Sequence, residues 1–274
     1  MKELKFNINY LFHKREFYFA IFIAIFVNLI HVILCVNESI RIGAFYEKMH
    51  SGEYQFILYN PIVTLNALLI IVFPIVFSMI FADSNFLENK RKTANMLTMR
   101  INNKKNIFSR ILLSIIVTFL ICFFSFLFNY ILLLLIYGSG NTITYYQETA
   151  FHLTLQPTWF LDNIRLSNPI IFILAINFFV SLMYGLLVAF SYIVSFFVKN
   201  KIVVYFIPLC FVILTELLFP LIGLGNISFI KCLQPFSQYS LLSYACCVGL
   251  IVIFSSILLI VYLKRKDTLI WNTF

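Results

Sequence analysis

Six apolar segments alternate with polar stretches along this chain, and each is about as long as a helix that crosses a membrane. The hydrocarbon core of a bilayer is about 30 Å thick, so about 20 apolar residues in an α-helix complete one crossing. The pattern predicts an all-α polytopic membrane protein with a single transmembrane domain over residues 1–274. We expect the six transmembrane helices near residues 17–36, 62–82, 108–137, 169–198, 202–220 and 241–263.

Two of these spans are longer than one crossing requires. Residues 108–137 and 169–198 would each reach about 45 Å as straight helices, since a helix rises about 1.5 Å per residue. We expect these helices to tilt, kink or project beyond the bilayer. Projection toward the cytoplasm would let them meet a partner.

The first segment, residues 1–16, has the pattern of an amphipathic helix that lies in the membrane interface. Its apolar positions, at helical spacing, are Leu4, Ile8, Leu11 and Phe12. The basic residues that we expect to lie toward lipid headgroups are Lys2, Lys5, His13 and Lys14. The alternative is a basic flank that does no more than precede the first span.

Residues 220–240 are too apolar for an ordinary loop and too broken for one helix. The breaks come from Pro220, Gly223, Gly225 and Pro235. Non-helical backbone at membrane depth occurs only where protein or water satisfies its polar groups. We therefore expect a short re-entrant or interfacial outer segment before the sixth span.

Composition strengthens the assignment to a membrane and excludes a soluble domain. The chain is 62% hydrophobic and 11% charged, whereas soluble domains carry about 25% charged residues. Sixteen of the 20 Lys and Arg residues fall on one predicted side, and cytoplasmic loops carry such an excess. Both termini and the segment 83–107, hereafter the connector, are therefore expected in the cytoplasm. The four cations on the other side are Arg41, Lys48, Arg165 and Lys231.

The sequence lacks the patterns of an enzyme. The six cysteines show no C-x-x-C spacing, and the four histidines are scattered. No H-E-x-x-H, G-x-S-x-G or phosphate-binding G-x-x-x-x-G-K-[ST] motif occurs. We expect no catalytic residue, no metal site and no cofactor bound by this chain, and ATP hydrolysis would have to occur in a partner.

A few polar residues within the spans are candidates for a translocation pathway or gate. Asn28 and His31 lie one helical turn apart in the first span, and interhelical hydrogen bonding explains such pairs more often than ligand binding. Glu216 is the clear acid within a span, and ionisable groups there are costly and often functional. It could face a central cavity and attract a cationic substrate, pair with Lys231, or sit protonated in a hydrogen bond within the bundle.

The connector carries a dense cationic run together with an apolar stripe. As a helix it would place one set of residues on roughly one face: Phe86, Leu87, Thr93, Ala94, Leu97 and Ile101. Lys90 interrupts this stripe, so the helix breaks there or the lysine snorkels. A loop that only sets topology needs no such stripe. The pattern therefore favours a docking helix whose basic groups meet headgroups or an acidic protein surface.

At this point the sequence resembles the six-span permease subunits of bacterial type-2 ABC exporters. After their second span these proteins carry two acids, Gly-Thr, a leucine pair and then basic residues. The corresponding residues here are Asp83, Glu88, Thr93, Leu97 and Arg100, followed by Lys104, Lys105 and Arg110. Lys92 stands where the family often has Gly, and the leucine pair is Met96-Leu97.

The resemblance implies two permeases, as a homodimer or with a related permease, beside two copies of a cytosolic ABC ATPase that binds ATP and Mg. The connector would be a cytoplasmic coupling helix in a groove of the ATPase, and the long third and fourth spans would carry its movement. The implied coupling residues are Asp83, Glu88, Thr93, Leu97, Arg100, Lys104 and Lys105. The membrane would be the bacterial cell membrane, with lipid as a further partner and no nucleic acid.

The substrate implied is a hydrophobic or amphipathic molecule, with peptides among the candidates. Two other classes stay open. An ion-coupled secondary transporter would work without an ATPase, and a membrane scaffold or sensor would transport nothing.

Overall fold

The computed structural model describes residues 2–41, 52, 56–58, 63–84, 103–138, 161, 164, 168–198, 200–233 and 240–271, and over these residues the protein is helical without strands. The helices are α1 (Lys2–Phe12), α2 (Arg15–Arg41), α3 (Val63–Phe81), α6 (Asn103–Tyr137), α9 (Pro169–Val194), α10 (Lys201–Leu221), α11 (Phe229–Leu233) and α12 (Leu241–Trp271). The all-α class expected from the hydrophobic pattern is confirmed for the described part of the chain.

Five helices are long and apolar enough to cross a membrane, by length and composition. They are Arg15–Glu38, Lys104–Tyr137, Pro169–Val194, Lys201–Leu221 and Leu241–Lys264. The second predicted span, 62–82, coincides with α3, a helix of 19 residues whose described apolar stretch is Leu69–Phe81. The helices therefore indicate a multi-pass membrane protein, while a sixth crossing stays a prediction.

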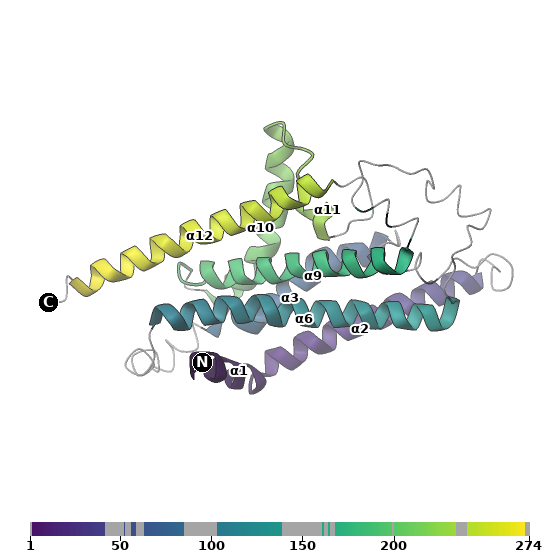
Figure 1. Ribbon diagram of the computed structural model, residues 1–274, viewed down its shortest axis with the longest axis horizontal. Coiled ribbons are helices and arrows are strands. Elements are labelled where there is room, and N and C mark those ends of the chain that lie inside the picture. The colour runs from purple at the N-terminus through teal and green to yellow at the C-terminus, as the bar shows by residue number, and fades with distance from the viewer. Residues whose placement is uncertain are drawn as a thin grey trace.

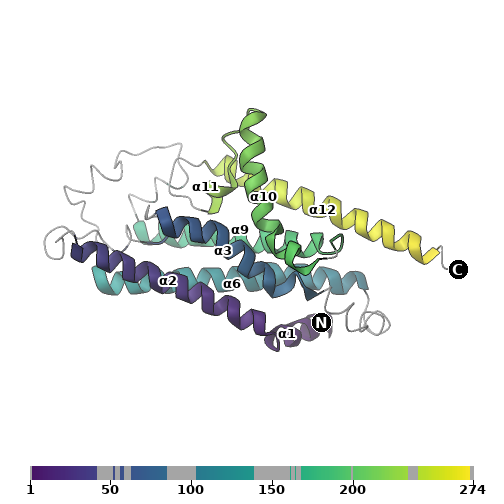
Figure 2. The same ribbon diagram turned by 180° about the vertical axis from the view of Figure 1, so that it is seen from behind.

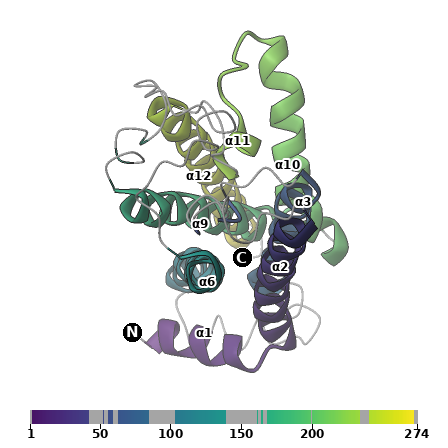
Figure 3. The same cartoon turned by 90° about the vertical axis from the view of Figure 1, so that its right-hand side faces the viewer.

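Helices α2, α3, α6 and α9 run along the long axis of the molecule, and α6 and α9 share the most extensive packing (Figures 1 and 2). Helix α1 lies across this direction beneath α2 and α6 (Figure 3). Helix α10 crosses the others steeply and projects beyond them, whereas α12 leaves the bundle toward the C-terminus. The N- and C-terminal ends lie at the same end of the bundle (Figure 1).

Helix α6 carries its uncharged polar residues on its buried side and large apolar residues along its exposed side. The buried polar residues, spaced by one or two helical turns, include Asn106, Arg110, Ser114, Thr118, Ser125 and Asn129. Its most exposed large apolar residues are Phe108, Phe124 and Leu135, at 65%, 60% and 78%. A helix in water shows the opposite pattern, whereas polar groups of membrane helices turn toward the bundle interior. This distribution supports a lipid-facing outer surface for α6.

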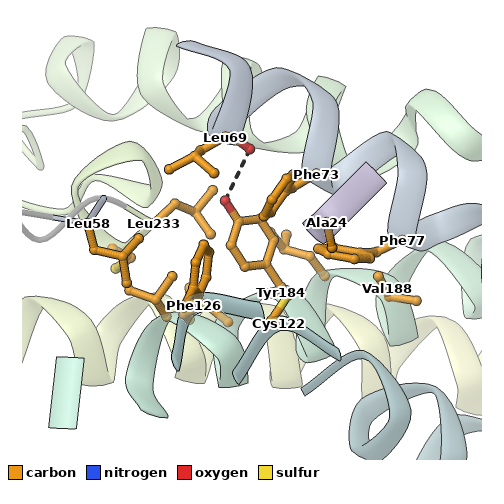
Figure 4. Packing of buried hydrophobic residues seen from close by; sticks show 14 of the residues in the cluster. Ala24, Leu58, Leu69, Phe73, Phe77, Cys122, Phe126, Tyr184, Val188 and Leu233 are labelled. Carbon is orange, nitrogen blue, oxygen red and sulfur yellow. Dashed lines mark hydrogen bonds between the residues drawn. The ribbon is translucent and has the colours of Figure 1, made fainter. Parts of the chain in front are cut away.

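The core of the bundle is built around Tyr184 of α9 (Figure 4). Its ring packs near Phe73 and Phe77 of α3, and its hydroxyl donates a hydrogen bond to the backbone carbonyl of Leu69, at 3.1 Å. The neighbouring Gly185 lets α6 and α9 approach closely, because a Cβ there would lie 2.9 Å from the carbonyl oxygen of Ile115. These contacts join α3, α6 and α9 into one packed unit.

The helix predicted at the start of the chain forms, but the direction predicted for the Lys14 side chain is wrong. We expected Lys14 to point toward headgroups, yet its side chain is buried with only 5% of its area exposed. The inward face of α1 instead carries Asn7 and Leu11, whereas Phe12 is 53% exposed. The reason is tertiary, because Lys14 finds hydrogen-bond acceptors at the end of α3 that the local pattern does not reveal.

The broken segment before the last span turns back toward the bundle. After α10 the chain makes a turn in which Gly223 has φ +77°, a left-handed conformation that suits glycine. The short helix α11 then packs against α3, α9 and α12. This agrees with the returning course expected for part of 220–240, while its position relative to a membrane stays a prediction.

Candidate functional site

The strongest polar site in the described residues lies where the connector begins. We call it the base cluster and define it as Lys14, Asp83, Lys201 and Tyr205. Lys14 occupies the corner between α1 and α2, and Asp83 comes directly after α3. Lys201 and Tyr205 stand one turn apart at the start of α10. Three segments that are distant in sequence therefore meet at one carboxylate.

Both oxygens of the Asp83 carboxylate are engaged, and its side chain has no exposed area. Oδ1 forms a close ion pair with the Lys14 ammonium. Oδ2 accepts hydrogen bonds from Lys201 Nζ at 2.9 Å and from the Tyr205 hydroxyl at 3.0 Å. A buried carboxylate with this many charged and hydroxyl donors is held in one orientation.

Lys14 also closes the end of α3. Its Nζ donates to the backbone carbonyls of Met79 and Ile80, at 2.7 and 2.8 Å. These carbonyls belong to the last turn of the helix, where no intrahelical donor is available and a cation is favoured. Burial lowers the pKa of the Lys14 ammonium, and the adjacent Asp83 carboxylate opposes that shift.

A fourth charge completes the balance around the cluster. Glu16, in the first turn of α2, lies 3.6 Å from Lys201 Nζ. Two cations and two anions therefore face one another, with Lys201 and Glu16 partly exposed and Lys14 and Asp83 buried. The buried pair carries the larger desolvation penalty, so removal of Asp83 would leave the Lys14 charge buried without its counter-charge, whereas Asp83 has Lys201 as a second cation.

Two hydroxyls fix the first turns of α10 to its neighbours around Pro208. Proline lacks an N–H, so the carbonyl of Val204 loses its intrahelical donor. Ser191 of α9 supplies a replacement at 2.7 Å. Ser78 of α3 donates to the carbonyl of Tyr205 at 3.0 Å. The start of α10 is thus attached to α3 and α9 by backbone contacts as well as through Asp83.

A second network joins α1 to the first turns of α6, where the connector ends. Asn7 Nδ2 donates to Asn106 Oδ1 at 2.9 Å, and Asn7 Oδ1 accepts from Arg110 Nε at 3.0 Å. Ser109 lies within 3.4 Å of the same amide nitrogen. All four side chains are buried. Helix α1 and the corner that follows it therefore contact both flanks of the connector: Asn7 of α1 contacts α6, and Lys14 of the corner contacts the end of α3.

A third group, which we call the mid-helix cluster, consists of Asn28, His31 and Asn129. Asn129 Nδ2 of α6 lies 3.0 Å from the carbonyl oxygen of Asn28 and 3.2 Å from His31 Nδ1, both on α2. Its Oδ1 accepts from the backbone N–H of Ile57 at 3.3 Å. The contact of His31 with Asn129 is an interhelical hydrogen bond of the kind expected, whereas the Asn28 side chain donates to the carbonyl of Ala24 in its own helix. Their part in a pathway stays a prediction.

The contacts of Glu216 decide one alternative raised by the sequence, an ion pair with Lys231. Both of its carboxylate oxygens lie 2.9 Å from the hydroxyl of Ser228, in the turn between α10 and α11. Lys231 shares this region through its backbone N–H, which donates to Ser228 Oγ at 3.2 Å. Within the residues described here, Glu216 and Lys231 form no ion pair, so the carboxyl group braces the turn instead.

The predicted coupling residues divide into two groups. Asp83 lies in the base cluster, and Lys104 and Lys105 are exposed in the first turn of α6. Glu88, Thr93, Leu97 and Arg100 lie outside the described residues. Sequence reasoning missed Lys201 and Tyr205, whose signal was no more than a lysine and a tyrosine at helical spacing beside the start of a span.

Neither metal-ligand groups among the described residues nor similarity to known proteins points to a further site. Over the described ranges, no group of three or more His, Cys, Asp or Glu side chains could hold a metal ion. Comparison of the chain with models of known families, with curated proteins and with solved structures finds no match.

Proposed function

We propose that this chain is the membrane-spanning permease subunit of an ATP-driven exporter of the type-2 class, and that the connector receives force from a separate cytosolic ATPase. The observation that supports this proposal best is the base cluster, which anchors the start of the connector to α1 and α10 by buried charged contacts. A loop that only sets membrane topology has no need of such an anchor.

Desolvation makes a buried ion pair costly unless its contacts are well formed. Two charges taken out of water carry a penalty of several kcal/mol per ion, which is recovered only with good geometry and additional hydrogen bonds. Asp83 and Lys14 have that geometry, with two helix carbonyls and a tyrosine hydroxyl among their partners. A stiff attachment of this kind suits a segment that must pass on force rather than absorb it.

The proposed assembly has two permease copies, either identical or related, and two ATPase subunits that bind ATP and Mg. The membrane is the bacterial cell membrane, with both termini and the connector in the cytoplasm. The substrate is a hydrophobic or amphipathic molecule, and peptides are the class we favour. Lipid is the surrounding partner, and no nucleic acid takes part.

Co-expression with a P-loop ATPase encoded by a neighbouring gene tests the proposal. We expect the ATPase to co-purify with the wild-type chain, and Glu88→Arg and Leu97→Asp in the connector to abolish co-purification or to uncouple ATP hydrolysis from transport. Leu224→Asp, in the exposed turn after α10, is a matched control that introduces the same charge elsewhere.

Unchanged assembly and unchanged coupled activity in both connector variants would contradict the proposal. Export that follows an ion gradient without any ATPase would favour a secondary transporter. A chain that neither binds an ATPase nor transports would favour a scaffold or sensor.

A further inference from the structure

We propose that movement of the connector is transmitted to α10 through the Asp83 carboxylate, with Lys201 and Tyr205 as positioning residues. This inference rests on the proposed function, since it concerns the route by which force enters the bundle. It differs from the expectation drawn from the sequence, in which the long third and fourth spans carry the movement.

The first step is the attachment itself. Lys201 and Tyr205 lie on one face of α10 and both bind Oδ2 of Asp83, at 2.9 and 3.0 Å. Because Asp83 is the first residue of the connector, any displacement of that segment acts on this carboxylate. Two donors from successive turns resist rotation of α10 about the contact better than a single one would.

The second step is the freedom of α10 beyond its anchored turns. Pro208 interrupts the helix just above the contacts with Ser78 and Ser191. Beyond Thr215 no residue of α10 is buried, and Leu217 and Leu221 are 63% and 83% exposed. This part of α10 projects away from the other helices (Figures 1 and 3). A small tilt of the anchored turns can therefore swing the last turns of α10, beyond Thr215, with little loss of buried contact.

The third step is that the alternative route, through α6 and α9, resists movement. Helices α6 and α9 meet in backbone contact at Gly185 and Ile115 and surround the buried ring of Tyr184. Close-packed interiors deform only at the cost of many contacts. Force applied at the start of α6 would have to move α6 and α9 together. Force applied at Asp83 acts on α10, which has an exposed face and can move more easily.

Helix α1 is part of the same moving unit. Lys14 links it to Asp83 and to the last turn of α3, and Asn7 links it to Arg110 on α6. Any tilt at the base cluster must therefore displace α1 as well. This distinguishes the inference from a scheme in which α1 and the connector receive force independently.

Spin-label distance measurements between the outer ends of α6 and α10 test the inference. The labels go on Leu135→Cys and Leu221→Cys, both highly exposed, in a chain whose less buried cysteines Cys210 and Cys246 are replaced by serine. The test variant is Lys201→Met with Tyr205→Phe, which leaves the Lys14–Asp83 pair intact and so protects folding. The control is Lys5→Met with Tyr18→Phe, which removes the same two groups at exposed positions of α1 and α2.

In the chain alone, we expect the test variant to broaden the distance distribution, because the start of α10 loses two of its attachments. We expect the control to match the wild type. An unchanged distribution in the test variant overturns the inference, whether or not an ATPase partner exists.

In the complex with the ATPase, a non-hydrolysable ATP analogue with Mg should shift the α10 label in the wild type. The test variant should lose that shift while a label at Phe12→Cys on α1 still moves. A shift retained in the test variant, or no shift of α10 in the wild type, overturns the inference. Failure of the ATPase to bind counts instead against the proposed function, and the measurement on the chain alone then decides the inference.

Discussion

The base cluster and the mid-helix cluster hold neighbouring helices together by different chemistry. The base cluster uses full charges, with Asp83 between Lys14 and Lys201 at the ends of helices. The mid-helix cluster uses neutral groups, with Asn129 between Asn28 and His31 in the middle of α2 and α6. The central residue of each cluster, Asp83 or Asn129, is buried, so burial alone does not explain the difference.

Helix ends explain the difference. At the end of α3 the carbonyls of Met79 and Ile80 lack intrahelical donors, and an ammonium group satisfies them while the nearby carboxylate balances its charge. Within α2 and α6 the backbone carbonyls are already hydrogen-bonded, so they would offset little of the desolvation penalty of a charge placed there. Charges therefore mark the end that we propose receives force, and amides join the helices at mid-length.

The largest effect is expected from breaking the base cluster on one side. Asp83→Leu should lower the free energy of unfolding by about 3–5 kcal/mol, because Lys14 stays buried without its counter-charge. The double variant Lys14→Met/Asp83→Leu should recover most of that loss. Unfolding of the detergent-solubilised chain measures both free energies. A double variant as unstable as the single one would show that loss of the Lys14–Asp83 pair does not cause the lower stability.

The next effect concerns packing between the two clusters. Gly185→Ala should cost about 1–3 kcal/mol, because its new Cβ would meet the backbone of Ile115 at 2.9 Å. Gly249→Ala on α12 is the matched control, since a Cβ there would meet no atom within 4 Å. Thermal unfolding of the two variants side by side checks this, and equal losses would contradict the close approach of α6 and α9.

A smaller effect is expected in the mid-helix cluster. Asn129→Leu should lower stability by about 0.6–1.7 kcal/mol, the range for interhelical hydrogen bonds in membrane proteins. Asn177→Leu should cost less, because only one of the two hydrogen bonds it removes joins two helices: the bond to the carbonyl of Phe123 does, and the one accepted from Ser181 lies within α9. If Asn129→Leu proves as costly as Asp83→Leu in the same unfolding assay, the contrast between charged ends and neutral middles fails.

The smallest effect on stability is expected at Glu216. Glu216→Gln should change the free energy of unfolding by less than about 0.5 kcal/mol, because the amide oxygen still accepts from Ser228. Export by the assembled complex should fall more than stability does if the carboxylate serves the pathway. Normal export by this variant would leave Glu216 with its bracing role alone.

Helix positions were predictable because they depend on local pattern. Long apolar runs predicted the helices around 17–36, 108–137 and 241–263, and each of these runs lies within a helix of the structure. Asp83 also stands out in the sequence as an acid just after an apolar run, but its contacts with Lys14, Lys201 and Tyr205 were not predicted. The coupling role of the connector stays a prediction, because Glu88 and Leu97 lie outside the described residues.

Side-chain direction at the corners was not predictable. The basic residues of 1–16 look alike in sequence, yet Lys14 turns inward while Lys5 stays exposed. The difference depends on helix carbonyls that lie 65 and 66 residues further along the chain. Similarly, nothing local links Tyr205 to Asp83, which is 122 residues away.

The amino-acid sequence by itself determined that this chain forms apolar helices suited to a membrane, because hydropathy and helical period act over neighbouring residues. Only the tertiary structure decided which charges meet at the base of the connector and which helix they hold. The physical reason is that a buried ion pair forms where three helix ends converge, and convergence is a property of packing rather than of local pattern.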